Sequence, residues 1–570
     1  MNAPTPALVA SRPERLRLVG QRRQILTMMH QRLMFGLLVY AGVIAVIVLR
    51  ILYLAAFGDH AGAKRSVTAL VPERGDIIDR DGQPLARTID AWTIGLWPGK
   101  VIGDKLDLAR KLAQLMPERD EVAYFAMLKS DKTFFYLRRR AAPGVVEAVN
   151  ALGEPGIALE REPDRLYPQT SLAAHVIGFT DTDGKGNAGI ERSMNDRLSD
   201  PAMRGQPLQL SISGRVQQAL EHELLAAMRK FSAIGAAGVI MDIHTGEVLA
   251  MTSLPQLNPN AAGQGSPEAR FNRATLGVYE LGSTFKPFTV AMAMDSGIIK
   301  SFGKMYPCPN KLQVGRRFIT DTHPFNRACS VAEIMQESSN IGTAQIADQL
   351  GAERQRAFLK KMGFLDRIGI ELGEVGRPLG PRDWSRSDVM TVGYGHSIAV
   401  SPLHLASGYA ALYNGGIYRR ATLLKVDRNH AAAKGHRVFS EDTSYKMRSL
   451  LRVVVTKGTG KKADAPGYRV GGKTGTANKA VPGGYSNTRV VTSFAGVFPM
   501  DEPRYAMVVM LDEPQPTAET YGFRTAGWNA APIMSTTVAR VAPMLGIRPD
   551  KNREPDMSLV LPFIHEKEKK

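Results

Sequence analysis

The sequence has few of the residues and motifs that build metal and thiol-redox centres. Only two of its 570 residues are cysteines, and neither a C-x-x-C nor an H-E-x-x-H motif occurs. The histidines stand apart from one another, and we expect structural roles for His244, His323, His396 and His404. The sequence therefore predicts neither a metal ion nor an organic cofactor.

Acidic residues are also fewer than basic ones, 54 against 73, which gives a formal net charge of +19. Aromatic residues make up 7% of the chain and are not interleaved with the basic residues, so a nucleic-acid partner is not predicted. We interpret most of the positive charge as solvated surface. An anionic wall polymer or lipid headgroup would be attracted to it.

Only one hydrophobic run is long enough to cross a membrane. Residues 33–49 contain no charge, and residues 51–57 extend the run beyond Arg50, whose long side chain can reach the interface. We therefore predict a membrane anchor over residues 33–57. Arginines dominate the preceding basic tail, residues 1–32, which places that tail in the cytoplasm and the rest of the chain outside it. A cleaved signal peptide is the alternative, but both its basic and its apolar segments would be unusually long.

The length predicts more than one domain beyond the anchor. We expect a non-catalytic domain over residues 58–215, a second domain over 216–548, and a mobile tail over 549–570, where the sequence becomes highly charged. Outside the cytoplasm Cys308 and Cys329 can pair, but their spacing alone leaves the disulfide undecided.

Three short motifs in the second domain together predict a serine nucleophile and its proton-transfer partners. They are Ser283-Thr284-Phe285-Lys286, Ser338-Ser339-Asn340 and Lys473-Thr474-Gly475. S-x-x-K also occurs at residues 301–304, but glycine and proline there disfavour a helix. After Ser283 the sequence favours one, with proline in the first turn, and residues three apart then share a face, so the Lys286 amine can reach the Ser283 hydroxyl.

A nucleotide-binding interpretation overlaps the third motif. Residues 467–474 match G-x-x-x-x-G-K-[ST], the phosphate-binding loop. That loop needs a buried strand before it and a helix after it, whereas residues 461–466 are polar and residues 475–484 are rich in glycine. We therefore predict a short strand over residues 469–477, which glycine keeps narrow enough for another molecule to approach its backbone.

The coarse pattern of elements indicates an α+β fold. Residues 75–86 predict two short strands joined by a turn at Asp81-Gly82. In the second domain, strands near 237–252 precede several helices, and strands near 473, 490–498 and 505–511 follow them. A closing helix is expected over residues 529–545. The first and last strands are then expected to share one antiparallel sheet flanked by helices.

On these motifs the chain resembles the class B penicillin-binding proteins, which are peptidoglycan D,D-transpeptidases. The segment 74–86 is similar to class B members in general, and the segments 165–168, 175–180 and 189–191 resemble the cell-division (septal, FtsI-type) branch in particular. The resemblance implies a single N-terminal transmembrane helix, a mixed α+β pedestal (dimerisation-type) domain, and a transpeptidase domain. It also implies an inner-membrane protein whose catalytic domain is periplasmic, at the division site. Its expected partners are a glycan-strand polymerase and other division proteins.

The resemblance also implies roles for individual residues in acyl transfer from stem peptides that end in D-Ala-D-Ala, with β-lactams as inhibitors. Ser283 is the expected nucleophile, and Lys286, Ser338, Asn340 and Lys473 are its expected catalytic partners. The backbone N–H groups of Ser283 and Thr476 are expected to form the oxyanion hole. Residues expected to bind substrate are Thr474, Gly475, Thr476 and Tyr521.

Other functions remain open from the sequence alone. A serine β-lactamase would use the same motifs, but it needs neither an anchor nor a preceding domain. A D,D-carboxypeptidase would pass the acyl group to water. A membrane-anchored β-lactam sensor would be acylated without turning over wall peptide, and an elongation-type transpeptidase would act away from the septum.

Overall fold

The computed structural model describes residues 29, 32–50, 74–427, 435–482 and 484–565. The chain divides into two units, Met1–Val71 and Pro72–Lys570, and each is considered by itself. The predicted basic tail lies outside the described residues except for residues 29 and 32. So does the second half of the predicted anchor, residues 51–57.

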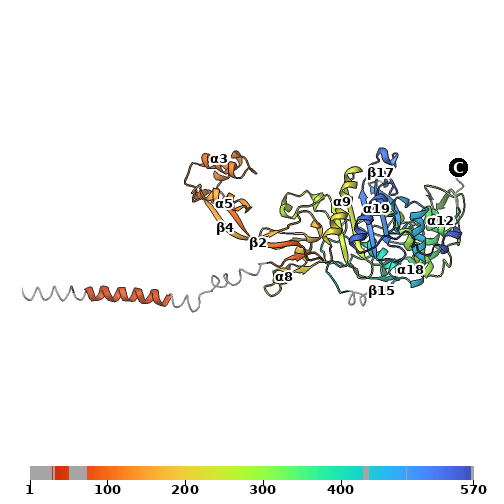
Figure 1. Ribbon diagram of the computed structural model, residues 1–570, viewed down its shortest axis with the longest axis horizontal. Coiled ribbons are helices and arrows are strands. Elements are labelled where there is room, and N and C mark those ends of the chain that lie inside the picture. Colours follow the sequence, from red (N-terminus) through yellow and green to blue (C-terminus); the bar gives the residue numbers. More distant parts are fainter. Residues whose placement is uncertain (1–28, 30–31, 51–73, 428–434, 483, 566–570) are drawn as a thin grey trace, which may run out of the picture. The chain divides into compact units, whose positions relative to one another are not determined.

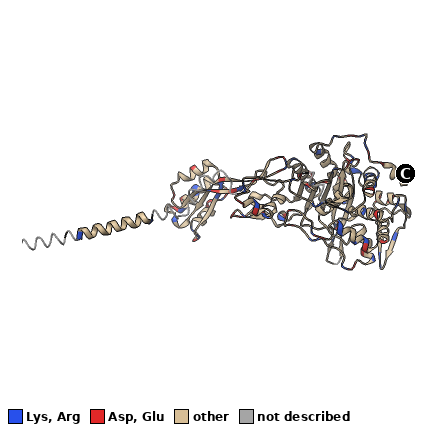
Figure 2. Cartoon of the chain, turned by 90° about the horizontal axis from the view of Figure 1, so that it is seen from below, with Lys and Arg blue, Asp and Glu red and all other residues tan. Residues whose placement is uncertain are grey.

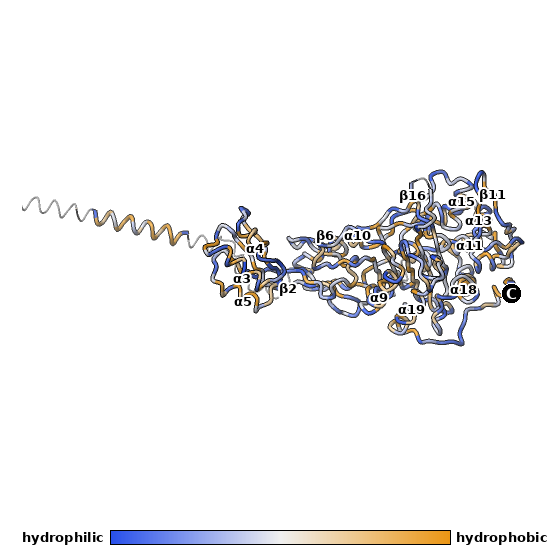
Figure 3. The backbone as a smooth tube through the Cα atoms, turned by 90° about the horizontal axis from the view of Figure 1, so that it is seen from above, coloured by the Kyte–Doolittle hydropathy of each residue, from blue (hydrophilic) through white to orange (hydrophobic). Residues whose placement is uncertain are grey.

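In the first unit, a helix of 19 residues over Arg32–Arg50 is long and apolar enough to cross a membrane. At 1.5 Å per residue it spans roughly 28 Å, close to the thickness of the hydrocarbon layer. Its basic residues lie at its ends (Figure 2), and apolar residues fill the length between them (Figure 3). The helix therefore matches the part of the predicted anchor that the structure describes.

The second unit begins with a small α+β region (Figure 1). A sheet formed by β1, β2, β3, β4 and β7 has three helices packed beside it, and short elements connect it to the remainder of the unit. These elements are β1 (Ile77–Ile78), β2 (Pro84–Leu96), η1 (Pro98–Lys100), α3 (Lys105–Leu115), α4 (Glu121–Leu128), β3 (Phe135–Ala141), α5 (Pro143–Asn150), β4 (Ile157–Leu166), α6 (Ala174–Ile177), β5 (Phe179–Thr180), β6 (Gly186–Ala188), α7 (Gly189–Ser193), α8 (Asn195–Ser199) and β7 (Leu208–Gln209).

The larger region contains a five-stranded antiparallel sheet in the order β16-β17-β18-β8-β9. Its strands are β8 (Gly235–Asp242), β9 (Val248–Leu254), β16 (Gly471–Val481), β17 (Gly484–Phe498) and β18 (Tyr505–Asp512). As predicted, the first and last strands of this region share one sheet. Strand β16 lies at the edge, which leaves one of its sides unpaired within the sheet.

Helices cover both faces of this sheet, because the strands are apolar on both sides. Along β18, Val508 and Met510 belong to one hydrophobic core, and Met507 and Val509 belong to the other. Helices α9 and α19 pack on the second face (Figure 1), and α11, α16 and α18 contribute to the core on the first. This two-sided burial explains the continuous apolar run of residues 505–511.

The helices and short turns of this region are α9 (Gly214–Lys230), η2 (Pro259–Gln264), α10 (Pro267–Arg270), η3 (Gly282–Phe285), α11 (Lys286–Asp295), α12 (Val331–Gln336), α13 (Asn340–Leu350), α14 (Ala352–Lys361), α15 (Arg386–Gly393), α16 (Pro402–Tyr413), α18 (Glu441–Thr456), η4 (Lys461–Ala463), η5 (Ala518–Thr520), α19 (Ala530–Met544), η6 (Met557–Leu559) and η7 (Leu561–Phe563). Small hairpins add the strands β10 (Met305–Cys308), β11 (Lys311–Val314), β12 (Arg317–Thr320), β13 (Arg327–Ser330), β14 (Ile417–Tyr418) and β15 (His436–Arg437). Cys308 and Cys329 form a disulfide between β10 and β13, with Cα atoms 6.0 Å apart.

The segment after Pro549 differs from the predicted mobile tail. Arg452 pairs with Glu554 at 2.6 Å, Val560 is fully buried, and the Ser330 hydroxyl donates to the Phe563 carbonyl at 2.6 Å. These contacts attach the chain to the domain as far as Phe563. Apolar residues of this segment, such as Val560, are buried against the domain, whereas the predicted mobility was based on the charged end of the sequence. Residues 566–570 lie outside the described residues.

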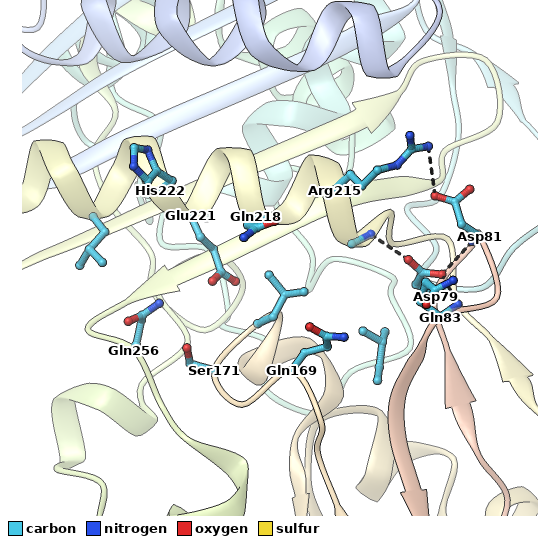
Figure 4. Close-up of a pocket in the computed structure, with 14 residues that line it drawn as sticks. Asp79, Asp81, Gln83, Gln169, Ser171, Arg215, Gln218, Glu221, His222 and Gln256 are labelled. Atoms are coloured by element: carbon cyan, nitrogen blue, oxygen red, sulfur yellow. Dashed lines mark hydrogen bonds and ion pairs between the residues drawn. The ribbon is translucent and has the colours of Figure 1, made fainter.

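An open cleft of about 810 Å³ lies where the β1–β2 turn meets the start of α9 (Figure 4). Asp79 spans this junction, accepting hydrogen bonds from the backbone of Asp81 at 2.8 Å and of Gly214 at 3.0 Å. Arg215 pairs with Asp81 at 3.5 Å across the same junction. The turn predicted from the sequence thus joins the smaller region to the larger one.

Candidate active site

The three motifs meet at one cavity of about 400 Å³. Ser283 comes from η3, Ser338 and Asn340 come from the start of α13, and Thr474 and Thr476 come from β16; all five residues line the cavity. The side chains of Lys286 and Lys473 are fully buried beneath it. Residues separated by up to 193 positions in the sequence, from Ser283 to Thr476, are therefore brought together.

The turn that contains Ser283 is held tightly against β16. A side chain at Gly475 would meet the Leu281 carbonyl oxygen at 2.3 Å, and one at Gly282 would meet the Thr476 carbonyl oxygen at 2.8 Å. Gly282 also has a φ of +55°, a conformation that glycine adopts without strain. The two glycines thus permit the close approach that places Ser283 beside Thr476.

Lys286 is held by the second motif. Its Nζ donates to Asn340 Oδ1 at 2.8 Å, to the Ser338 carbonyl oxygen, and to Ser338 Oγ at 3.2 Å. Ser338 has a φ of +62°, an uncommon conformation that is consistent with a functional constraint at this turn. Asn340 Nδ2 donates to the Thr320 carbonyl at 3.1 Å, which turns its amide oxygen toward the lysine.

Burial, together with the charge of Lys473, lowers the pKa of Lys286 well below its usual value. A neutral amine has two N–H donors, which match the Asn340 and Ser338 carbonyl oxygens, and a lone pair that can accept a hydroxyl proton. Burial also lowers the pKa of Lys473 to about 7. The site thus contains an amine that is poised to act as a base, next to a second lysine whose charge can change near neutral pH.

Lys473 lies along β16 with its Nζ 3.3 Å from Thr474 Oγ1, and that hydroxyl lies 2.9 Å from Thr459 Oγ1. Thr476 Oγ1 accepts a hydrogen bond from the Ala526 backbone at 3.0 Å and keeps its own proton to donate. These hydroxyls and the lysine form a polar wall that suits a carboxylate. Beyond Lys473 the chain continues as a strand, so the helix that a phosphate-binding loop needs is not formed there.

Tyr521, the remaining predicted site residue, does not line the cavity. Its side chain is 78% exposed, and its ring contacts that of Trp528, which does line the cavity, at a centroid distance of 5.5 Å. Phe523 stacks on the same indole, and Lys462 lies 3.4 Å from the ring centroid. Tyr521 therefore reaches the cavity only through Trp528.

Sequence reasoning missed other residues of the site. Asp321 accepts hydrogen bonds from Ser339 Oγ at 2.6 Å and from the Asn340 backbone at 2.5 Å, which fixes the start of α13. Thr459, Trp528 and His396 also line the cavity. Their positions depend on contacts between distant segments, and no local motif marks them.

The other S-x-x-K sequence, at residues 301–304, lies in a turn, as predicted. Lys304 Nζ donates to the Ile298 carbonyl at 2.9 Å and to Gln349 at 3.0 Å, and neither group belongs to the cavity.

Comparison with known proteins identifies the family. The penicillin-binding protein transpeptidase domain matches residues 236–535, and the penicillin-binding protein dimerisation domain matches residues 69–206. The chain therefore belongs to the penicillin-binding proteins and has the domain pair that was expected from the sequence.

Individual relatives narrow the assignment. The chain is 40% identical over 488 residues to the probable peptidoglycan D,D-transpeptidase FtsI of Caulobacter vibrioides, covering 83% of this chain and 82% of the relative. It is 30% identical over 511 residues to peptidoglycan D,D-transpeptidase FtsI of Escherichia coli, covering 84% of each. Penicillin-binding protein 3 of Mycobacterium tuberculosis, solved in complex with aztreonam, has the same fold, with a TM-score of 0.66 and 24% identity over 86% of this chain and 99% of that one.

Proposed function

We propose that this chain is a peptidoglycan D,D-transpeptidase that cross-links wall peptides through a serine acyl-enzyme during septum formation. The main support is the fully buried Lys286, which Ser338 and Asn340 hold beneath the cavity that Ser283 lines. The names of the relatives support the substrate class and the septal role.

In the first half-reaction, Ser283 Oγ attacks the carbonyl carbon of the penultimate D-alanine in a stem peptide. A serine hydroxyl is a weak nucleophile, and neutral Lys286 accepts its proton as the new C–O bond forms. The C–N bond to the terminal D-alanine then breaks. Lys286 returns the proton through Ser338 to the leaving amine, so an ester on Ser283 and free D-alanine result.

The edge of the sheet positions the donor peptide. Because β16 is the edge strand, an extended peptide can add beside it, with its carbonyl oxygen at the backbone N–H groups of Ser283 and Thr476. Each such donor contributes about 3 kcal/mol to stabilising the oxyanion. Lys473 with the hydroxyls of Thr474 and Thr476 binds the terminal carboxylate, and Gly475 lets the strand lie close to the turn that contains Ser283.

In the second half-reaction, an amine from another stem peptide attacks the ester carbon, an amide forms, and Ser283 regains its proton. A β-lactam places its ring carbonyl where the D-Ala-D-Ala bond would lie and leaves a long-lived ester on Ser283. Neither half-reaction consumes a cofactor.

The helix over Arg32–Arg50 makes the chain a single-pass membrane protein in this proposal. The basic N-terminal residues lie in the cytoplasm, and the catalytic domain lies in the periplasm, where the wall is built. At the division site the anchor and the dimerisation domain would contact a glycan-strand polymerase and other division proteins.

The proposal is tested with the purified full-length protein, lipid-linked wall precursor and a glycan polymerase, followed by separation of the digested products. Cross-linked peptide dimers are expected, and penicillin should abolish them. Tetrapeptide monomers without dimers would instead indicate a D,D-carboxypeptidase. Acylation by penicillin with no turnover of wall peptide would indicate a sensor. Midcell fluorescence of a tagged protein tests the septal role against an elongation role.

A further inference from the structure

His396 and Glu280 form a pair in the wall of the active-site cavity. His396 Nδ1 lies 3.7 Å from Glu280 Oε2, and the imidazole lines the cavity together with Ser283. Glu280 Oε1 is itself fixed, because it accepts hydrogen bonds from the Ser397 backbone at 2.8 Å and from the Tyr485 hydroxyl at 2.9 Å. The sequence suggested only a structural role for this histidine, because its carboxylate partner is more than a hundred residues away.

The imidazole has a defined orientation. The Tyr394 and Tyr485 rings contact it at centroid distances of 5.2 Å and 5.9 Å, and Nδ1 faces the carboxylate. In the described part of the chain, Nε2 has no hydrogen-bond partner, and it is the ring nitrogen available to a molecule in the cavity. The Gly395 carbonyl accepts a hydrogen bond from the Gly282 backbone at 3.2 Å, which anchors the loop of His396 beside the turn that contains Ser283.

The acceptor amine must give up a proton before it can react in this cavity. Lys461 and Lys462 line the cavity, and Lys473 lies buried beneath it. An acceptor amine is an ammonium ion at neutral pH, and these positive groups disfavour that form. An ammonium nitrogen has no lone pair, so it must lose a proton before it can attack the ester carbon.

Few groups in the cavity wall can accept that proton. Lys286 is needed to carry the other proton, from the attacking nitrogen to Ser283 Oγ. His323 and Glu337 also line the cavity, but no carboxylate pairs with His323 in the described structure, and Gln336 contacts Glu337 at 3.3 Å. His396 combines an open ring nitrogen with a carboxylate on its opposite side, which stabilises the imidazolium when it forms.

On the basis of the proposed function, we propose that His396, oriented by Glu280, is the base that deprotonates the acceptor ammonium in the second half-reaction. One N–H bond of the ammonium breaks, Nε2 takes the proton, and it later releases that proton to solvent. The neutral amine then forms the C–N bond and the ester C–O bond breaks. Lys286 moves a second proton from the nitrogen to Ser283 Oγ, and the last N–H stays in the amide. His396 is a catalytic residue in this scheme, and Glu280 is a positioning residue.

The test separates the two half-reactions in the full-length protein. A thioester analogue of the donor peptide forms the acyl-enzyme, and a D-amino acid at millimolar concentration serves as the acceptor. The measured quantity is the ratio of aminolysis to hydrolysis. His396→Gln should lower this ratio by about 100-fold, the lower end of the usual size of general base effects. Glu280→Gln should lower it less. The matched control His222→Gln should not change it, because His222 lies 3.4 Å from the Glu223 carboxylate but outside the active-site cavity.

The acylation rate with fluorescent penicillin is measured in the same variants and should stay within about twofold of the wild type, because the base acts only after acylation.

The groups facing His396 are Glu280, Lys286, Tyr394 and Tyr485. Burial lowers the pKa of His396, which keeps the imidazole neutral at neutral pH. The deficit of His396→Gln should therefore shrink as the pH rises toward the pKa of the acceptor amine, where the acceptor needs no base.

An unchanged ratio in His396→Gln would overturn the proposal. So would an equal fall in aminolysis and hydrolysis, because the base would then serve water as well, or a deficit that is the same at every pH. A wild-type protein that is acylated but forms no aminolysis product would instead contradict the proposed transpeptidase function itself.

Discussion

Lys286 Nζ lies 2.8 Å from Asn340 Oδ1, across 54 residues of sequence. The contact uses an amide oxygen, which accepts a hydrogen bond without carrying a charge. A carboxylate at the same position would stabilise the protonated lysine, and a protonated lysine cannot accept the proton of Ser283. The neutral partner therefore helps to keep Lys286 in its basic form.

Asn340→Asp should consequently slow acylation by fluorescent penicillin by about 100-fold at pH 7, the order of effect expected when a general base is lost. An aspartate at the first residue of α13 interacts favourably with the helix dipole, which offsets the loss of the hydrogen bond from Asn340 Nδ2 to the Thr320 carbonyl. The deficit should diminish at high pH, where Lys286 loses its proton despite the new charge. A deficit that is independent of pH would contradict this account.

Much of the site could be predicted from the sequence, because each motif is local. The proline after Lys286, the order of the three motifs and the two-sided apolar strands indicated the helix, the nucleophile and the sheet. Asp321 and the pair of Glu280 with His396 could not be predicted, because their function depends on contacts between loops that no periodicity marks. The disulfide was undecided for the same reason.

The segments that indicated a class B protein and its septal branch also have a structural explanation. Arg74, Arg165 and Glu191 come from three separate segments and meet in one buried cluster. Glu191 is fully buried and lies 2.7 Å from the guanidinium Nε of each arginine. The sequence showed the three segments, but their convergence on one carboxylate could be seen only in the fold.

A second prediction concerns the identity of the nucleophile. Ser283→Ala should abolish labelling by fluorescent penicillin, because the ester forms on that hydroxyl. Ser301→Ala is the matched control, since Ser301 begins the other S-x-x-K sequence but lies in a turn outside the cavity. Labelling is read on a denaturing gel. A labelled Ser283→Ala protein would show that another residue is acylated.

A third prediction concerns stability. Glu191→Ala leaves two buried guanidinium groups facing each other without their carboxylate, and it should reduce the free energy of unfolding by about 3–5 kcal/mol. Asp90→Ala is the control, because Asp90 pairs with Arg161 at 3.4 Å and both side chains are more than 60% exposed. That change should cost no more than about 1 kcal/mol. Urea unfolding followed by tryptophan fluorescence measures both, and equal losses would contradict a structural role for the buried cluster.

The last prediction is the pH dependence of acylation. Lys286 must be neutral to act as a base, so the rate should rise as the pH passes its lowered pKa. Lys473 must be charged to bind the carboxylate of penicillin, and burial lowers its pKa to about 7, so the rate should fall as the pH rises through that value. Lys473→Arg keeps its charge at high pH and should lose the falling limb, even if the larger side chain lowers the maximum rate. Lys462→Arg changes a lysine that lines the cavity beside Trp528 and should keep the limb. If the falling limb persists in Lys473→Arg, its cause lies in a group other than Lys473.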